Sequence, residues 1–126
     1  MIDYDFAILR VVPKVQLGTW VNVAVMMHAR TEEFLAIRAE SDANRLSRLA
    51  PGLDTALLCR YLDTYADICA GNPVAGPVAL APPSERFHWL TAPRSDVLQA
   101  SPVHEGVCHD LASELDRLFG MYVTPA

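Results

Sequence analysis

The chain has 126 residues, of which 52% are hydrophobic and 20% charged, and its formal net charge is −5. This length and apolar content suit a single folded domain, and they exclude intrinsic disorder as a description of the whole chain. The acidic balance, with no basic stripe in the sequence, counts against DNA or RNA as the main ligand.

The sequence contains no signal for export or membrane insertion. No apolar run reaches the roughly 18 residues that a membrane-spanning helix needs, and Met1–Asp5 lacks the basic and then apolar pattern of a signal peptide. The cysteines Cys59, Cys69 and Cys108 form no Cys-x-x-Cys pair, which favours reduced thiols over a disulfide framework. We therefore expect a cytoplasmic protein in which residues 1–126 form one domain.

The N-terminal part of the chain predicts three strands. Tyr4–Val12, Thr19–His28 and Glu33–Ala39 are rich in β-branched and large apolar residues. Pro13–Gly18 predicts a hairpin connection, because Pro13 ends the first strand and Gly18 is free to adopt a positive φ. Short links between consecutive strands favour an antiparallel meander.

The hydrophobic period then becomes helical. Ser41 or Asp42 can cap a short helix that ends near Leu49. Apolar residues at three- and four-residue steps predict a longer helix from Asp54 to Ala70, with Gly71 as its C-terminal cap.

The C-terminal part alternates between turn-forming and apolar segments. Pro77–Ala81 is expected to run extended along a sheet edge, Glu85–Leu90 to form a fourth strand, and Asp96–Ala100 a fifth. Spaced leucines predict a final amphipathic helix from about Asp110. The whole pattern predicts an α+β fold, with a mainly antiparallel sheet of about four to five strands packed against two to three helices.

Two polar residues interrupt the apolar strands. Strand alternation places Arg10 on the face of Tyr4, Phe6, Ile8 and Val12, and it places Asn22 on the face of Trp20, Ala24 and Met26. A buried guanidinium or amide is costly unless it is paired. Each residue therefore has either an internal hydrogen-bond partner, a route to the sheet edge, or a ligand.

The segment Phe87–Gly106 is the second candidate region. Arg94 with the hydroxyl and backbone N–H of Ser95 would form an anion pocket, and Ser101 and His104 lie on a neighbouring turn. The alternative is a pair of ordinary turns in which Ser95 or Ser101 makes local hydrogen bonds. Ser101 with His104 as nucleophile and base has weaker support, because no G-x-S-x-G elbow is present. Zinc at His104, Cys108 and His109 is equally weak, because ligands usually come in pairs from two places.

Two separated motifs resemble a known bacterial family. They are Tyr4–Pro13 with Val21–Val25, and Phe87–Leu90 with Arg94-Ser95 and Ser101–Gly106. Together they resemble the family catalogued as domain of unknown function 3037 over nearly the whole chain. Ala24 stands where that family commonly has glycine. The resemblance implies no catalytic residue, but it implies a neighbouring gene for a HipA-like kinase, and hence a protein partner.

Two functions follow as hypotheses. The first is a binding or accessory domain that acts with a partner protein, such as a HipA-like kinase, through an exposed patch around Trp89 or Met121-Tyr122. The second is a small enzyme or ligand-binding domain for a phosphorylated or carboxylated metabolite, with no cofactor or metal. Its ligand-binding residues would be Arg10, Asn22, Arg94, Ser95, Ser101 and His104. A homo-oligomeric role remains open, whereas no feature of the sequence favours a membrane partner.

Overall fold

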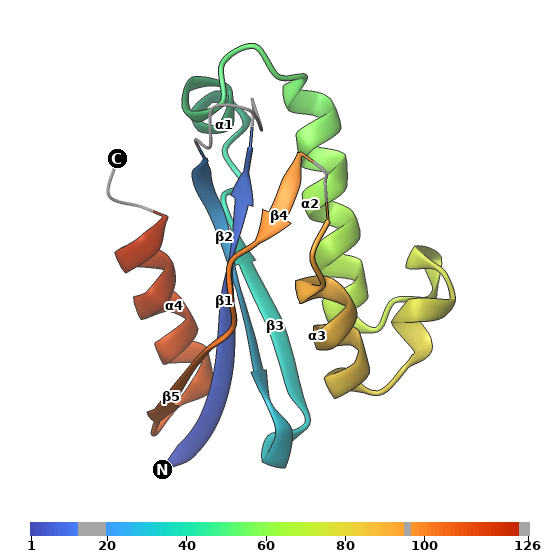
Figure 1. The fold of residues 1–126 in the computed structure, drawn as a ribbon, viewed down its shortest axis with the longest axis vertical. Helices are drawn as coiled ribbons and strands as arrows, with labels where there is room; N and C mark the ends of the chain where they lie inside the picture. Colours follow the sequence, from blue (N-terminus) through green and yellow to red (C-terminus); the bar gives the residue numbers. More distant parts are fainter. Residues whose placement is uncertain (13–19, 95–96, 124–126) are drawn as a thin grey trace.

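Helices cover both faces of an antiparallel sheet (Figure 1). The computed structural model describes residues 1–12, 20–94 and 97–123, and these residues contain five strands in the order β3-β2-β1-β4, with β5 also paired with β1. The strands are β1 (Ile2–Val11), β2 (Val21–Ala29), β3 (Phe34–Ala39), β4 (Leu98–Ala100) and β5 (His104–Cys108). Strand β1 is central, because it pairs with β2 along one edge and with both β4 and β5 along the other.

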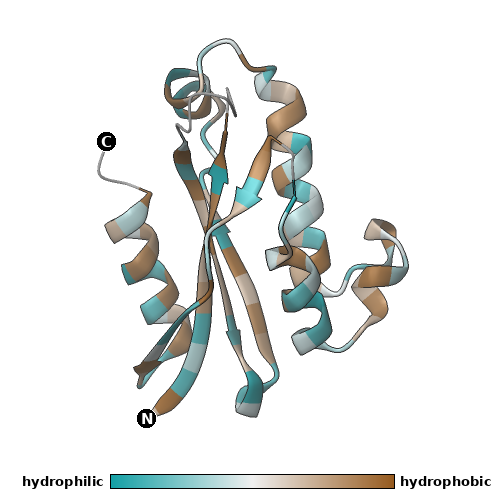
Figure 2. Ribbon diagram, in the orientation of Figure 1, coloured by the Kyte–Doolittle hydropathy of each residue, from teal (hydrophilic) through white to brown (hydrophobic). Residues whose placement is uncertain are grey.

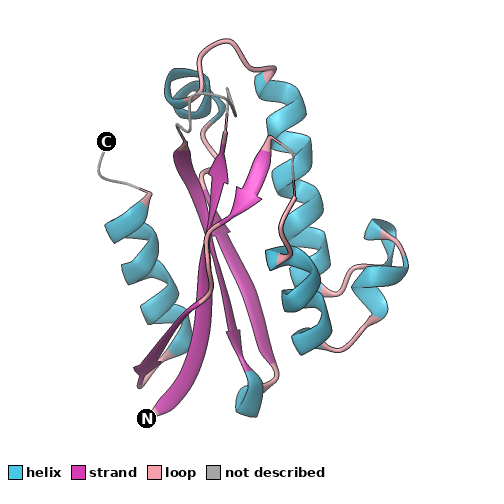
Figure 3. Cartoon of the chain, in the orientation of Figure 1, coloured by secondary structure: helices cyan, strands magenta, loops and turns pink. Residues whose placement is uncertain are grey.

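The helices divide between the two faces of the sheet (Figure 3). Helix α4 (Leu111–Tyr122) covers one face, and α1 (Ala43–Leu49), α2 (Thr55–Ala70) and α3 (Pro83–Thr91) cover the other. Short 3₁₀ helices, η2 (Arg30–Glu32), η3 (Pro73–Ala75) and η4 (Pro77–Leu80), lie in the connections.

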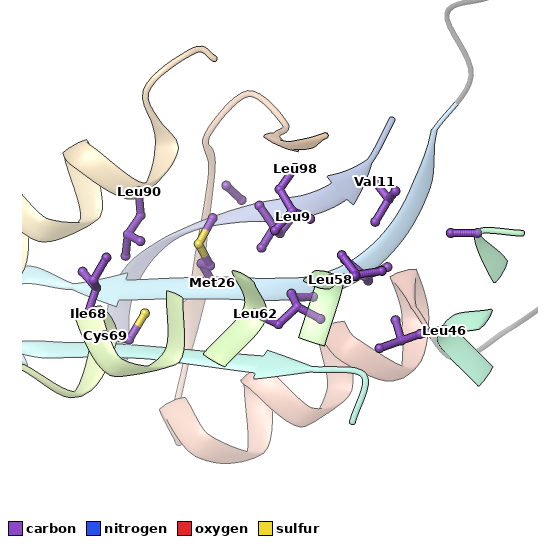
Figure 4. Close-up of a cluster of buried hydrophobic side chains, with 14 of the residues drawn as sticks. Leu9, Val11, Met26, Leu46, Leu58, Leu62, Ile68, Cys69, Leu90 and Leu98 are labelled. Atoms are coloured by element: carbon purple, nitrogen blue, oxygen red, sulfur yellow. The ribbon is translucent and has the colours of Figure 1, made fainter. Parts of the chain in front are cut away.

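Each face of the sheet has its own apolar cluster. On the α2 side, Leu9 and Met26 of the strands meet Leu58 and Leu62 of α2 and Leu90 of α3 (Figure 4). On the α4 side, alternate strand residues such as Phe6, Ile8 and Met27 meet Leu115 and Phe119. Apolar residues accordingly run through the strands and recur along α2 and α4 (Figure 2).

The predicted α+β class and the first three strands are confirmed. The meander is β1-β2-β3, all antiparallel, and its strand limits lie close to the predicted ones. The side chain of Asp42 caps α1, the side chain of Asp54 caps α2, and Gly71 ends α2 with a φ of 73°. The final helix begins after Asp110, close to the predicted start, and the Asp110 side chain caps it. The predicted Pro13–Gly18 hairpin connection lies outside the described residues.

The predicted fourth strand, Glu85–Leu90, is wrong, because this segment belongs to helix α3. Pro83 at the start of the helix favours its first turn, and Phe87 and Leu90, three residues apart, are buried on one side. The guanidinium of Arg86 also donates to the carbonyls of Ile68 and Cys69 at the end of α2, which anchors α3 there. The three-residue spacing of these buried apolar positions suits a helix better than a strand.

The structure also differs from two predictions of extended segments. Pro77–Ala81 is not extended, because Pro77–Leu80 forms the 3₁₀ helix η4. The predicted fifth strand, Asp96–Ala100, is shorter in the described residues, where β4 spans Leu98–Ala100. The sequence predictions also missed β5 (His104–Cys108), a short strand that includes glycine and has three exposed residues, His104, Glu105 and Val107.

A β-bulge reverses the prediction for Asn22. The register of β1 and β2 shifts between Leu9, which faces Ala24, and Arg10, which faces Asn22, so Val23 is an extra residue. Asn22 therefore does not share the face of Ala24 and Met26. It lies opposite Arg10 on the α4 side, and its Nδ2 donates to the Tyr122 carbonyl at 3.0 Å.

Ser101 joins β4 and β5 along the edge of β1. Between the two ladders, Ala7 and Ile8 of β1 face the three residues from Ser101 to Val103, and Pro102 among them has no N–H to donate. The Ser101 N–H donates to the Ile8 carbonyl at 2.8 Å, and the Ser101 hydroxyl accepts the Ile8 N–H at 2.8 Å. One buried side chain thus replaces a backbone carbonyl that the bulged strand cannot supply.

Replacing this hydroxyl should destabilise the fold. Ser101→Ala leaves the buried Ile8 N–H without an acceptor, which should cost about 1–3 kcal/mol of unfolding free energy. Urea unfolding followed by circular dichroism measures this loss. Ser113→Ala, an exposed serine of α4, is the matched control and should change stability by no more than about 0.5 kcal/mol. Equal effects of the two variants would show that the hydroxyl does not join the strands.

Candidate functional site

Arg10, Asn22 and two exposed aromatic residues form one surface at the end of α4. The guanidinium carbon of Arg10 lies 4.5 Å from the ring centroid of Trp20, which is 55% exposed. Asn22, opposite Arg10, is bonded to the Tyr122 carbonyl. Met121 and Tyr122 are 50% and 39% exposed. We call Arg10, Trp20, Asn22, Met121 and Tyr122 the Trp20–Tyr122 surface.

His104 borders this surface from β5. It pairs with Phe6, whose ring centroid lies 5.3 Å from that of His104 and 6.0 Å from that of Tyr122. His104 is therefore on the same face as Arg10, but four residues away along β1, or about 13 Å at the usual rise of a strand. His104 is exposed, and its ring contacts Phe6 in a tilted arrangement with 39° between the ring planes.

Arg94 and Ser101 lie elsewhere, beside a shallow depression between α3 and β4. This depression of about 270 Å³ is lined by Thr91, Pro93, Arg94 and the residues from Gln99 to Pro102. The guanidinium of Arg94 stacks on Trp89, with 4.2 Å to the ring centroid, and its Nη2 donates to the Trp89 carbonyl at 2.7 Å. Arg94 thus caps the C-terminus of α3, where a cation is favourable.

The six predicted ligand-binding residues do not share one pocket. Arg10, Asn22 and His104 lie on the α4 face, and Arg94 and Ser101 line the depression beside α3. The Ser101 hydroxyl is engaged with Ile8 and also donates to the Pro102 carbonyl at 2.9 Å. Ser95 lies outside the described residues.

A larger pocket of about 470 Å³ occupies the N-terminal end of β1, at the end of the sheet marked N in Figure 1. Four elements contribute its charged and titratable lining, which consists of Asp3, Tyr4, Asp5, His28, Arg30 and Glu105. Asp5 faces His28 across one ladder and Glu105 across the other. The three carboxylates therefore lie on the side of the sheet that α2 and α3 cover, just past the apolar cluster. We call this the β1 pocket.

The sequence predictions missed the β1 pocket. The available signal was alternation in β1, where Asp3 and Asp5 occupy the face that continues with the fully buried Ala7 and Leu9. Charged residues in such positions need a partner or an opening to solvent. Glu105 could not have been placed beside them, because its strand was not predicted.

Tyr4, Glu114 and Arg117 form a network that binds α4 to β1. The Tyr4 hydroxyl donates to the Glu114 carboxylate, which also accepts from Nε and Nη2 of Arg117 at 2.7 and 2.9 Å. Hydrogen bonds from Arg117, and then from Tyr4, lower the pKa of Glu114 to about 2. Burial and the bond to Glu114 raise the pKa of Tyr4 to about 12. The Tyr4 ring packs across Gly106, where an added Cβ would lie 2.5 Å from the ring.

The cysteines are free, and two of them are buried. Burial raises the pKa of Cys69 to about 12 and also raises the pKa of Cys108, which keeps both thiols protonated at neutral pH. The described parts of the chain contain no group of three or more His, Cys, Asp or Glu side chains that could hold a metal ion. Within the same parts, no helix combines the length and apolar character needed to cross a bilayer.

These features define an α+β domain with a central antiparallel sheet. The model of the family described as "Protein of unknown function (DUF3037)" matches residues 6–123. The chain therefore belongs to this family, as the resemblance of its motifs predicted. No curated protein and no solved structure matches the chain.

The Glu114 network makes a specific pH prediction. Because the pKa of Glu114 falls from 4.5 to about 2 on folding, its ionised form stabilises the protein above pH 4.5, and this stabilisation is lost as the pH falls toward 2. Glu114→Gln should lower the unfolding free energy at neutral pH by about 1–2 kcal/mol. The difference from wild type should shrink on acidification, as measured by urea unfolding at successive pH values.

Asp116→Asn on the same helix is the control. Asp116 pairs with Arg38 in an exposed ion pair, which contributes little to stability. A pH dependence of Glu114→Gln no different from that of Asp116→Asn would contradict the assignment of the low pKa to Glu114.

Proposed function

We propose that this chain is a binding domain that acts with a partner protein and contacts it through the Trp20–Tyr122 surface. The observation that carries the proposal is the exposure of three large apolar side chains, Trp20 beside Arg10 just before β2, and Met121 and Tyr122 at the end of α4. Tryptophan, tyrosine, methionine and arginine are the residues enriched where proteins bind each other.

The surface is also pre-organised. Arg10 holds the Trp20 ring by a cation–π contact, and Asn22 holds the end of α4 by its bond to the Tyr122 carbonyl. Side chains fixed before binding lose less conformational entropy in the complex. Exposed aromatic rings in such fixed positions support a binding role better than a role in folding, because they contribute little to either core.

The kinase-like partner implied by the family resemblance is the first candidate for this surface. A HipA-like kinase that presents an apolar patch with a carboxylate for Arg10 would complement it in shape and charge. Arg94 is the residue that best supports the alternative function, recognition of an anionic metabolite. However, its guanidinium already donates to three backbone carbonyls, which belong to Trp89, Leu90 and Ala92.

The test is direct binding of the purified domain to a HipA-like kinase of the kind that the family resemblance implies, measured by biolayer interferometry. We expect binding at micromolar concentration, and a loss of at least about tenfold in affinity for Trp20→Ala, because central aromatic residues dominate interface energies. Met121→Ala should weaken binding by a smaller factor.

Trp89→Ala is the matched control, since Trp89 is also an exposed tryptophan stacked on an arginine, Arg94, but lies on α3. It should bind as the wild-type domain does. No association with the kinase, or a loss confined to Trp89→Ala, would overturn the proposed surface.

A further inference from the structure

We propose that the β1 pocket is a binding site for a guanidinium group. The site is independent of the Trp20–Tyr122 surface, because Asp3 and Asp5 point to the opposite face of β1 from Tyr4, Phe6 and Arg10. None of its lining residues belongs to the Trp20–Tyr122 surface, and three of them, Asp3, Asp5 and Glu105, carry carboxylates.

The carboxylates of the pocket lie on adjacent strands, where like charges are unfavourable. Asp5 and Glu105 are directly opposite each other on β1 and β5, and Asp3 lies two residues from Asp5 on the same face. Like charges directly opposite in a ladder destabilise the sheet. Arg30 from η2 offsets one of the three negative charges at the rim, so a cation in the pocket would relieve the remaining repulsion.

His28 points to a ligand independently of the acidic residues. It is 6% exposed and lines the pocket. Its ring nitrogens are not among the fully buried, unpartnered side-chain atoms of the described residues, and no hydrogen bond joins them to another described residue, so they are accessible to solvent or to a ligand at the pocket. Burial lowers the pKa of His28, against the opposing effect of Asp5, so the ring is neutral at neutral pH and one nitrogen is available to accept an N–H.

The lining favours a planar cation. The His28 ring stacks on Phe87, with 5.3 Å between centroids and 21° between planes, and His28 also lines the pocket. A guanidinium has five N–H donors in a plane and pairs with carboxylates in bidentate fashion. The volume of about 470 Å³ is in the range of small-molecule sites.

The guanidinium could belong to a free amino acid or amine, or to an arginine side chain of another protein. Arg30 distinguishes the two sources, because its charge can pair with the carboxylate of free arginine but finds no such group on agmatine or on a blocked arginine. Calorimetric titration of the full chain with arginine, agmatine and N-acetylarginine amide therefore tests both, with citrulline as the uncharged analogue.

We expect agmatine to bind saturably at up to about millimolar concentration and citrulline not to bind. Asp5→Asn should weaken agmatine binding at least about tenfold, the loss expected for a charge-assisted bidentate contact. Glu105→Gln, at an exposed position, should weaken it as well and serves if Asp5→Asn does not fold. Asp63→Asn, which removes an exposed charge of α2, should leave binding unchanged.

A further comparison identifies the source of the group. Tighter binding of arginine than of agmatine, abolished in Arg30→Gln, would assign the site to a free amino acid. Equal binding of agmatine and N-acetylarginine amide would assign it to a protein side chain. The proposal is overturned if none of the three guanidinium compounds binds at about 10 mM, or if Asp5→Asn and Glu105→Gln both bind agmatine as the wild type does.

Discussion

The rest of the structure depends on strand β1 being paired along both edges. On one edge its residues from Asp5 to Val11 pair with β2, and on the other it meets β4 and β5 in turn. Those two short strands behave as one because Ser101 bridges the bulge between them with a backbone and a side-chain bond to Ile8. Without that bridge β5 would hold only five paired positions at the edge of the sheet, and the wall that it gives to the β1 pocket would not be fixed.

Alternation along β1 then separates two kinds of surface. Tyr4, Phe6 and Arg10 face α4, where the Tyr4–Glu114 bond secures the helix whose end carries Met121 and Tyr122. The intervening residues face α2 and α3, where Asp3 and Asp5 extend beyond the apolar cluster into the β1 pocket. The proposed partner surface is aromatic with one cation, whereas the proposed guanidinium site is acidic. Strand β1 would therefore contribute to two binding sites of unlike chemistry, one on each of its faces.

The sequence predicted the elements whose signals are local. Helix α2 has a long 3.6-residue period, a capping aspartate and a terminal glycine, and the meander has apolar strands with short links. It failed where long-range contacts decide the outcome. The bond from Asn22 to α4 depends on a bulge opposite Leu9 and Arg10 that no local pattern encodes. Strand β5 is short and mostly exposed, and it pairs with the edge of β1 alone. The β1 pocket was missed for the same reason, since Glu105 comes from that strand.

Native-state hydrogen exchange of the Ile8 amide, followed by NMR, tests the continuity of this edge most directly. If Ser101 joins β4 and β5, the Ile8 N–H should exchange only through global unfolding, with protection equal to that of the most protected amides of β1 and β2. Exchange of Ile8 as rapid as that of exposed loop amides, with the remaining amides of β1 still protected, would contradict the account. It would mean that β5 opens independently and that neither the edge nor the pocket beside it is fixed.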